Sequence, residues 1–321
     1  MRKKDLALGI DIGGTNTSFG FVDREGALLT AASMRSNARE SAQTFVSRLH
    51  QQIEKLRSRL PAQHQVCGVG IGAPNAHHER GTIEKAVNLN WGETVDFAGL
   101  MGKYYDLPVS ITNDANAAAL GELLFGNARG MKNFIVVTLG TGLGSGIVAD
   151  GRLIYGASGF AGELGHTVVD PDGRACECGK KGCLETYVSA TGLRRTAMEL
   201  LALRCDASPL REISYQNMSS KVIADLAGKG DIIALAAFDR TARILGMKLA
   251  DAVAHVSPEA IFLAGGLAAA GDLLLKPAEQ SMKDFLFRAY CGTVKLMPSG
   301  LETGRSAILG AAALIWSELK L

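Results

Sequence analysis

The chain has 321 residues, which is enough for two domains. Hydrophobic residues make up 47% and charged residues 21%, a balance typical of a soluble globular protein that excludes a disordered chain. The 34 basic and 32 acidic residues nearly cancel, so the net charge attracts neither nucleic acid nor an anionic membrane. The first apolar run is stopped by Asp11, too early for a signal peptide or a membrane span. We therefore expect a cytoplasmic protein.

An apolar run from Leu6 to Ile12 leads into a glycine-containing turn and a second apolar segment. The pattern predicts a strand, a turn and a strand. In the turn, Gly13 and Gly14 would let the backbone approach an anion, and Thr15 could donate its hydroxyl to a phosphate oxygen. Asp11, at the end of the first strand, is suited to hold Mg²⁺ through water. Taken alone, an ordinary hairpin that uses glycine for its geometry explains the motif equally well.

The segment from Phe134 to Asp150 repeats this design, with the strand FIVVTL, a glycine-rich run from Gly140 to Gly146 and a second apolar strand. Aligning Gly14-Thr15 with Gly140-Thr141 brings the flanking strands into near register. Two such copies suggest two related domains that face one nucleotide. Neither copy is a P-loop, because no Lys-Ser/Thr pair follows the glycines. Neither opens a helix, which argues against a Rossmann dinucleotide site.

Between the copies, a helix is predicted over Ala42–Leu60 and strands over Val66–Ile71 and Val109–Thr112. The second of these strands is followed by Asn113 and Asp114 and by an Ala- and Leu-rich helix. An aspartate in that place could only cap the helix. The carboxyl end of a strand in an α/β fold is equally the usual place for catalysis.

The loop after residue 71 reads Gly72-Ala73-Pro74-Asn75, and His77 and His78 follow on a segment that we expect to be exposed. The segment 88–91, Asn-Leu-Asn-Trp, could line a polyol pocket or close a core. Near the C-terminus a short strand runs into Gly265-Gly266, which could pass beneath an adenine or form an ordinary strand-to-helix turn. Further helices are predicted over Val188–Leu203, Ile232–Val256 and Ala307–Leu319.

One imidazole and three thiols cluster in the segment from 162 to 185, namely His166, Cys176, Cys178 and Cys183. Together they would complete the tetrahedral shell of a structural Zn²⁺. A lone disulfide or free buried thiols are the alternatives, but soft ligands at this density favour zinc. Two carboxylates, Glu163 and Glu185, bracket the cluster. Their negative charge suits hydrogen bonding to sugar hydroxyls.

Taken together, these motifs resemble those of the ROK (repressor, open reading frame, kinase) sugar kinases, within the hexokinase–actin–Hsp70 superfold. The resemblance covers essentially the whole chain. It rests on DIGGT at 11–15, NDANAAALGE at 113–122, LGTGLGSGI at 139–147, ELGH at 163–166, CECGKKGCLE at 176–185 and LAGGL at 263–267. One departure is Asn75, where many family members have glycine after the proline.

The resemblance implies an α/β fold of two RNase H-like domains around a cleft, with a structural zinc loop. The domains would be residues 1–113 plus about 301–321, and residues 114–300. It makes Asp114 the general base and His166 both a zinc ligand and a sugar ligand. The remaining sugar contacts would be Asn113, Glu163, Glu185, Gly72 and Asn88. The nucleotide would be held by Asp11, Gly13, Gly14, Thr15, Thr141, Gly142, Gly265 and Gly266.

The implied activity is ATP-dependent phosphorylation of a hexose, with glucose 6-phosphate as the expected product and Mg²⁺ accompanying ATP. N-acetylglucosamine, N-acetylmannosamine, mannose, fructose and allose are alternative acceptors that the sequence does not separate. Because the family includes repressors, a DNA-binding role is the chief alternative. Only ten residues precede Asp11, too few for a helix-turn-helix, and no basic stripe is present. A non-catalytic sugar-binding module is a further alternative. The family also implies a homodimer or homotetramer.

Overall fold

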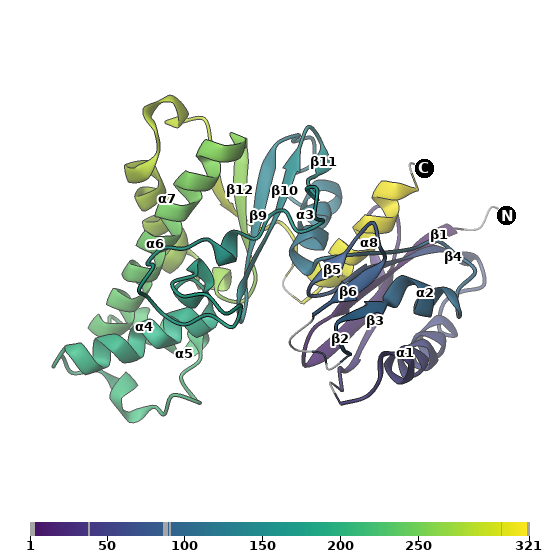
Figure 1. Cartoon of the computed structure of the whole chain (residues 1–321), viewed down its shortest axis with the longest axis horizontal. Helices are drawn as coiled ribbons and strands as arrows, with labels where there is room; N and C mark the ends of the chain where they lie inside the picture. The colour runs from purple at the N-terminus through teal and green to yellow at the C-terminus, as the bar shows by residue number, and fades with distance from the viewer. Residues whose placement is uncertain (1–3, 38, 86–88, 90, 303, 320–321) are drawn as a thin grey trace. The chain divides into compact units, whose positions relative to one another are not determined.

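The computed structural model describes residues 4–37, 39–85, 89, 91–302 and 304–319. The chain divides into two compact units (Figure 1). The first contains Met1–Met131, Leu153–Ala161 and Gly300–Leu321, and the second contains Lys132–Arg152 and Gly162–Ser299. The boundary expected after residue 113 falls inside the first unit, because helix α3 (Asp114–Phe125) packs against helix α8 (Ser306–Glu318) of the same unit. The assignment of functional domains stays a prediction.

The first unit is built on a five-stranded sheet in the order β3-β2-β1-β4-β8. Strand β1 lies parallel to β4, and β4 lies parallel to β8, whereas β2 and β3 continue the sheet antiparallel to their neighbours. The predicted strand over residues 6–12 is confirmed. The edge strand β3 was not predicted, because its exposed and half-buried residues alternate without a strongly apolar run. The bounds are β1 Lys4–Ile12, β2 Asn16–Val22, β3 Leu28–Arg35, β4 His64–Gly72 and β8 Val109–Thr112.

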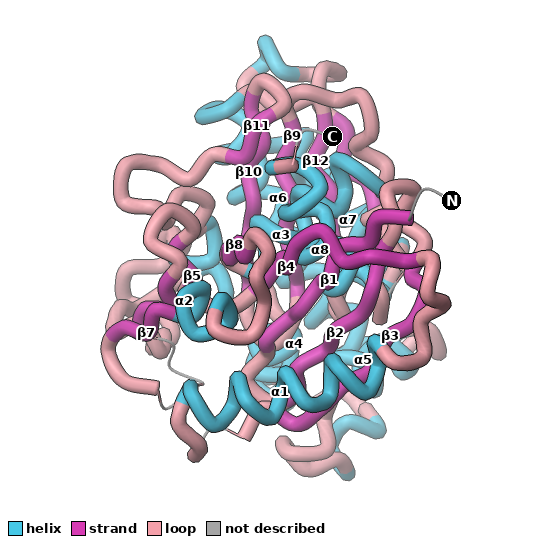
Figure 2. The backbone as a smooth tube through the Cα atoms, turned by 90° about the vertical axis from the view of Figure 1, so that its right-hand side faces the viewer, coloured by secondary structure: helices cyan, strands magenta, loops and turns pink. Residues whose placement is uncertain are grey.

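Helices cover both faces of this sheet (Figure 2). Helix α1 (Ala42–Arg57) buries Phe45, Leu49 and Ile53 against strand residues on one face. Helix α8 buries Ile308, Ala312 and Ile315 with residues of β1 and β2 on the other face. Four consecutive small residues in α8, Gly-Ala-Ala-Ala at 310–313, allow this close approach. The same helix packs against α3, and it thereby supports the element that begins with Asp114.

A small three-stranded sheet, β5-β6-β7, and the short helix α2 (Phe97–Gly102) complete the first unit. Its strands are Ala76–His77, Thr82–Glu84 and Thr94–Asp96. The expectation that His77 is exposed was wrong, since only 3% of the residue is accessible. Its ring forms a T-shaped pair with the ring of Phe160, with centroids 5.6 Å apart. The adjacent His78 stacks on Tyr155, with centroids 4.3 Å apart. Residues returning from later in the sequence thus cover a segment that the local pattern leaves open.

The second unit has a sheet of the same design, in the order β11-β10-β9-β12-β13. Strand β10 is antiparallel to β9, and β12 and β13 extend the sheet in parallel. The predicted internal repeat is therefore confirmed at the level of strand order. The second glycine turn is shorter than expected, because β10 already begins at Leu143. The bounds are β9 Phe134–Leu139, β10 Leu143–Ala149, β11 Arg152–Leu153, β12 Ala260–Ala264 and β13 Lys295–Pro298.

Four helices of the second unit share one hydrophobic core with residues of β9 and β12. They are α4 Ala190–Leu203, α5 Ser220–Ala227, α6 Ile232–Val256 and α7 Asp272–Phe285, with short 3₁₀ turns at Leu164–His166 (η1), Leu184–Thr186 (η2), Pro209–Glu212, Ala268–Ala270 and Arg288–Tyr290. The predicted α6 is confirmed to the residue. Helix α4 starts two residues later than predicted because Ser189 caps it through the Gly192 N–H. Among the described residues, no helix is long and apolar enough to cross a membrane.

Candidate functional site

The carboxyl ends of three parallel strands meet at one edge of the first sheet. Asp11 on β1 is paired with Gly72 on β4, and Gly72 is paired with Thr112 on β8. Asn113 and Asp114 follow Thr112 directly. Four predicted site residues of the first unit, Asp11, Gly72, Asn113 and Asp114, thus lie together at the edge where α/β folds bind their ligands.

Asp114 is the first residue of α3, and Asn113 rather than Asp114 is the N-cap. The Ala115 N–H donates to Asn113 Oδ1 and to Asp114 Oδ1, each at 2.8 Å. Because Asn113 already caps the helix, the capping alternative does not account for an aspartate at position 114. The residue as a whole is solvent-exposed. Desolvation by the surrounding protein nevertheless raises the pKa of its carboxyl, and the hydrogen bond from the Ala115 N–H acts in the opposite direction.

Asp11 is half-buried, and burial raises its pKa to about 7, with a further contribution from the negative charge of Asp114. Because Gly72 has no side chain, the space between Asp11 and Asp114 is left open. A β-carbon at Gly72 would lie 3.7 Å from Asp114 Cα and 3.8 Å from Asp11 Oδ1. The negative charge of Asp114 raises the pKa of Asp11, and such a pair of neighbouring carboxylates forms a site that favours a cation.

The two glycine turns occupy matching places in the two sheets. The first, residues 13–15, joins β1 to β2, and the second, residues 140–142, joins β9 to β10. Counted from the ends of β1 and β9, Gly13 corresponds to Gly140, which shifts the expected alignment by one residue. Both threonines, Thr15 and Thr141, are exposed. Gly14 lies half-buried between Gly13 and Thr15.

Gly265 and Gly266 follow β12 at the same edge of the second sheet. Gly265 has a φ of +91°, and a β-carbon there would meet Leu139 O at 2.6 Å, so the fold itself requires glycine. A β-carbon at Gly266 would meet no described protein atom within 4 Å. The turn geometry therefore explains Gly265, and the predicted adenosine contacts of both glycines stay predictions.

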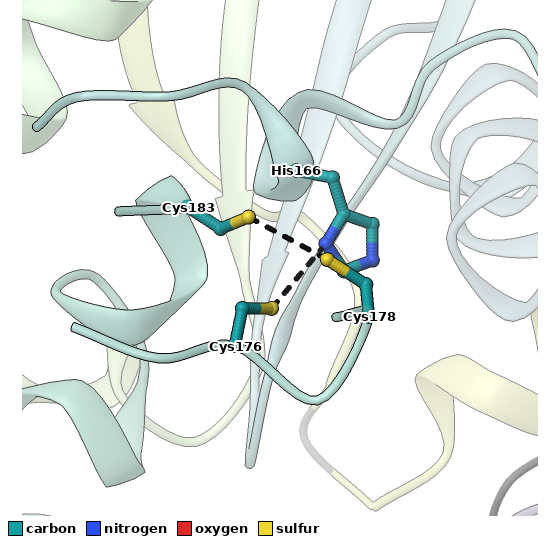
Figure 3. Close-up of side chains that lie close together, drawn as sticks. All are labelled: His166, Cys176, Cys178 and Cys183. Atoms are coloured by element: carbon teal, nitrogen blue, oxygen red, sulfur yellow. Dashed lines mark hydrogen bonds between the residues drawn. The ribbon is translucent and has the colours of Figure 1, made fainter. Parts of the chain in front are cut away.

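His166, Cys176, Cys178 and Cys183 converge in the second unit (Figure 3). Their ligand atoms all lie within 4.8 Å of one another. Cys176 Sγ is 3.7 Å from His166 Nδ1, and Cys178 Sγ is 3.6 Å from Cys183 Sγ. Two sulfurs on one tetrahedral zinc are separated by about 3.8 Å when each Zn–S bond is about 2.3 Å. The four side chains thus fit a zinc ion, whereas a sulfur separation of 3.6 Å is too long for a disulfide.

The two bracketing carboxylates face the two ring nitrogens of His166. Glu163 Oε2 lies 3.9 Å from Nε2, and Glu185 Oε1 lies 3.8 Å from Nδ1. Nδ1 also faces Cys176, so Nε2 remains for another partner. One ring nitrogen is thus available to a metal and the other to a second ligand, and both roles of His166 stay predictions.

Glu185 also reaches the second glycine turn. Its Oε2 accepts a 3.3 Å hydrogen bond from the Leu143 N–H. A β-carbon at Gly142 would lie 2.6 Å from the same oxygen, so this carboxylate requires glycine at that position. The thiol-and-imidazole cluster and the predicted phosphate turn are therefore joined through one side chain.

Two more residues were singled out by the sequence analysis, Asn88 as a sugar contact and Asn75 as a departure from the family pattern. Asn88 lies outside the described residues. Asn75, the departure from the family pattern, has a left-handed backbone with φ of 52°, and its amide donates to Lys85 O at 3.1 Å. Asparagine tolerates this region better than most residues with a side chain. The substitution for glycine therefore keeps a backbone conformation that glycine adopts freely.

Arg174 was missed by the sequence analysis. It lies two residues before Cys176, and its guanidinium donates to the carbonyl of Thr186, the residue after Glu185. No local pattern separates a buried arginine from a solvated one. The only signal is its position inside the cysteine-rich segment.

A model of the ROK family matches residues 7–318. The chain belongs to the ROK family. A curated glucokinase from Halalkalibacterium halodurans is 35% identical over 285 residues, which is 87% of this chain and 85% of that protein. A curated xylose repressor from Caldicellulosiruptor bescii is 32% identical over 286 residues, which is 87% of this chain and 70% of the repressor.

This ROK chain is also similar to a solved ROK family glucokinase from Streptomyces griseus in complex with glucose and AMPPNP. The identity is 33%, the TM-score is 0.82, and the match covers 96% of this chain and 98% of the other. The α/β fold with two mixed sheets is thus shared with a sugar kinase. Both kinases and repressors are among its relatives, so residue chemistry must decide between the two activities.

Proposed function

We propose that the chain is an ATP-dependent glucokinase that transfers the γ-phosphoryl group to the 6-hydroxyl of glucose. The observation that carries this proposal is the place of Asp114, beside Asp11 and Gly72 at the carboxyl edge of the first sheet. A repressor needs to bind its sugar but has no need of a base there. The similarity to glucokinases that cover nearly the whole chain supports the same choice.

In this proposal Asp114 accepts the proton of the attacking hydroxyl. Its raised pKa increases its basicity, and the exposed residue is accessible to a substrate. Asn113 is proposed to hold a neighbouring sugar hydroxyl, and Gly72 to leave room for the ring. The proposed base is held by two constraints, the start of α3 and the packing of that helix on α8.

The ATP phosphates are proposed to be held by the two glycine turns, through the hydroxyls of Thr15 and Thr141 and the backbone of Gly13, Gly14 and Gly142. Asp11 is proposed to hold Mg²⁺ through water. The cation, when bound, would neutralise charge on the transferred phosphoryl group. It would also favour the ionised form of Asp11, whose pKa is raised without it.

Glucose is proposed to be recognised by Glu163, Glu185 and the Nε2 of His166. These acceptors and the imidazole N–H suit sugar hydroxyls, which both donate and accept hydrogen bonds. A structural Zn²⁺ on His166, Cys176, Cys178 and Cys183 would fix the ring orientation of His166. With four protein ligands, the ion would have no position for a catalytic water. Its role would therefore be to hold the segment that presents Glu185.

The test is coupled ADP release from purified protein with ATP and Mg²⁺ over a panel of hexoses and N-acetylhexosamines. We expect turnover with glucose and a kcat/KM for glucose above those for mannose, fructose, allose and the N-acetylhexosamines. A different best sugar would correct the substrate. Sugar binding without turnover of any sugar, in folded and zinc-loaded protein, would contradict the kinase and favour a binding or repressor role.

The RNase H-like superfold, the cytoplasmic location and a homodimer or homotetramer remain parts of the proposal. The matching strand order of the two sheets supports the first. Light scattering on the purified protein tests the last.

A further inference from the structure

Arg174 lies in the cysteine-rich segment, and its side chain is only 10% exposed. All five of its guanidinium N–H groups have acceptors. Nε donates to Glu199 Oε1 at 2.8 Å, and Nη1 donates to the carbonyls of Thr186 at 2.6 Å and Gly192 at 3.1 Å. Nη2 lies 2.9 Å from Thr196 Oγ1 and 2.8 Å from Glu199 Oε2. A planar guanidinium whose five N–H groups all have acceptors is held in one orientation.

The main chain of Arg174 is fixed as well. Its N–H donates to Tyr187 Oη at 3.1 Å, and its carbonyl accepts from the Gly182 N–H at 2.8 Å. The guanidinium also lies over the Tyr187 ring, 4.4 Å from the centroid. Arg174 thus connects the segment before Cys176 to residues on both sides of Cys183, namely Gly182 and Thr186.

We propose that Arg174 is a positioning residue for sugar recognition, which acts by fixing the peptide that carries Glu185. Thr186, whose carbonyl it holds, is the next residue in the η2 turn. The Glu185 carbonyl is fixed in turn by the Ser189 hydroxyl at 2.7 Å. This inference rests on the proposed function, because it assigns the purpose of a contact around a proposed sugar ligand. A shift of about 1 Å in a positioned group can cost on the order of a hundredfold in rate.

The positioning is independent of the metal cluster. Every acceptor of the Arg174 guanidinium lies in η2 or α4, and none is one of the four clustered side chains. Loss of the guanidinium fork should therefore leave the zinc shell filled and disturb Glu185.

The experiment compares R174K with R240K. Lysine keeps the charge but replaces the planar fork by a single ammonium, which cannot reach all the acceptors. Arg240 contacts the same Glu199, at 3.4 Å, but its side chain is 44% exposed, so R240K is a matched control. For R174K we expect the KM for glucose to rise about tenfold. Its kcat should stay within about threefold, its KM for ATP unchanged and its zinc content at one ion per chain. R240K should match the wild type.

A merely structural role would lower the melting temperature and the yield of active enzyme, but it would not raise the KM for one substrate. If R174K does not fold, T196V removes a single acceptor with little change of shape, and a smaller rise in the same KM is expected. An unchanged KM for glucose in a folded variant overturns the inference. Loss of zinc together with equal changes in both KM values also overturns it. Calorimetric glucose binding separates the failure of this inference from the failure of the proposed function. Wild type that binds glucose without turnover contradicts the kinase, but the glucose affinities of wild type, R174K and R240K can still be compared.

Discussion

Asp114→Asn is the substitution that tests the proposed chemistry most directly. Asparagine keeps the size of the side chain and can still accept the hydrogen bond that the Ala115 N–H now donates to Asp114 Oδ1 at 2.8 Å. It cannot accept the proton of an attacking hydroxyl. Because Asn113 remains the N-cap, the start of α3 should be preserved.

Loss of a general base typically lowers turnover by about 10²- to 10⁴-fold, which corresponds to about 2.7–5.4 kcal/mol of activation free energy. The same substitution should not lower the free energy of unfolding. A negative charge in the first turn of a helix contributes about 0.3–1 kcal/mol. The surrounding protein acts in the opposite sense, since it raises the pKa of Asp114 above its unfolded value.

The sign of that second effect follows from proton linkage. Between the unfolded pKa of 3.8 and the raised folded pKa, the folded state binds more protons. Stability contributed by this group is therefore present at low pH and is lost as pH rises through the folded pKa. Where it is ionised, Asp114 is therefore destabilising, and we expect Asp114→Asn to be at least as stable as the wild type.

The assay measures kcat by coupled ADP release, glucose affinity by calorimetry and stability by urea denaturation at pH 7.5. Asp106→Asn serves as the control, because Asp106 is exposed in the loop before β8, at the opposite end of that strand. Its kcat should be unchanged. A kcat of Asp114→Asn within tenfold of the wild type, at unchanged glucose affinity, would refute the assignment of Asp114 as the base.

Three further outcomes are expected. Burial raises the pKa of Asp11 to about 7, so its contribution to stability is lost as pH rises from about 4 to 7. Without Mg²⁺, the melting temperature of Asp11→Asn should therefore depend less on pH in that window than the melting temperature of the wild type. Cys178→Ser, or chelation of the metal, should remove zinc, destabilise the fold by about 2–4 kcal/mol and weaken glucose binding, measured by metal analysis, denaturation and calorimetry. Gly70→Ala should lower the free energy of unfolding, measured by urea denaturation, by about 1–3 kcal/mol, because its β-carbon would lie 1.9 Å from Ala311 O. Gly102→Ala is the control, since a β-carbon there would meet no described atom within 4 Å, and its stability should be unchanged.

The sequence predicted those parts of the fold whose signals are local. The strand before Gly13 and the strand FIVVTL are continuous apolar runs that end at glycine turns, and both are confirmed. Four metal-type ligands within one short segment likewise converge in the structure. In each case the residues that determine the structure are neighbours in the sequence.

Features that depend on distant residues were not predictable in this way. His77 has the composition of an exposed loop, but Phe160 and the turn at Gly159 cover it. The segment that holds Tyr155 belongs to the first unit although it follows strands of the second. Arg174 is equally hidden in the sequence, because two of its five acceptors are main-chain carbonyls without a residue signature and the other three lie on Thr196 and Glu199, more than 20 residues away.

The motif NDANAAALGE illustrates why a family pattern extends beyond its chemistry. Asp114 stands at one end of α3 at the edge of the sheet, and Glu122 stands near the other end, 1% exposed. Glu122 Oε2 accepts from the Asn127 N–H at 2.9 Å, and Oε1 accepts from the Gly300 N–H at 3.0 Å. A buried carboxylate in such a place must be satisfied by donors, and here one of them, the Gly300 N–H, comes from the chain leading into α8. Since α8 packs on α3, the buried acid secures the helix that carries the proposed base, and one short motif specifies both the reacting group and its support.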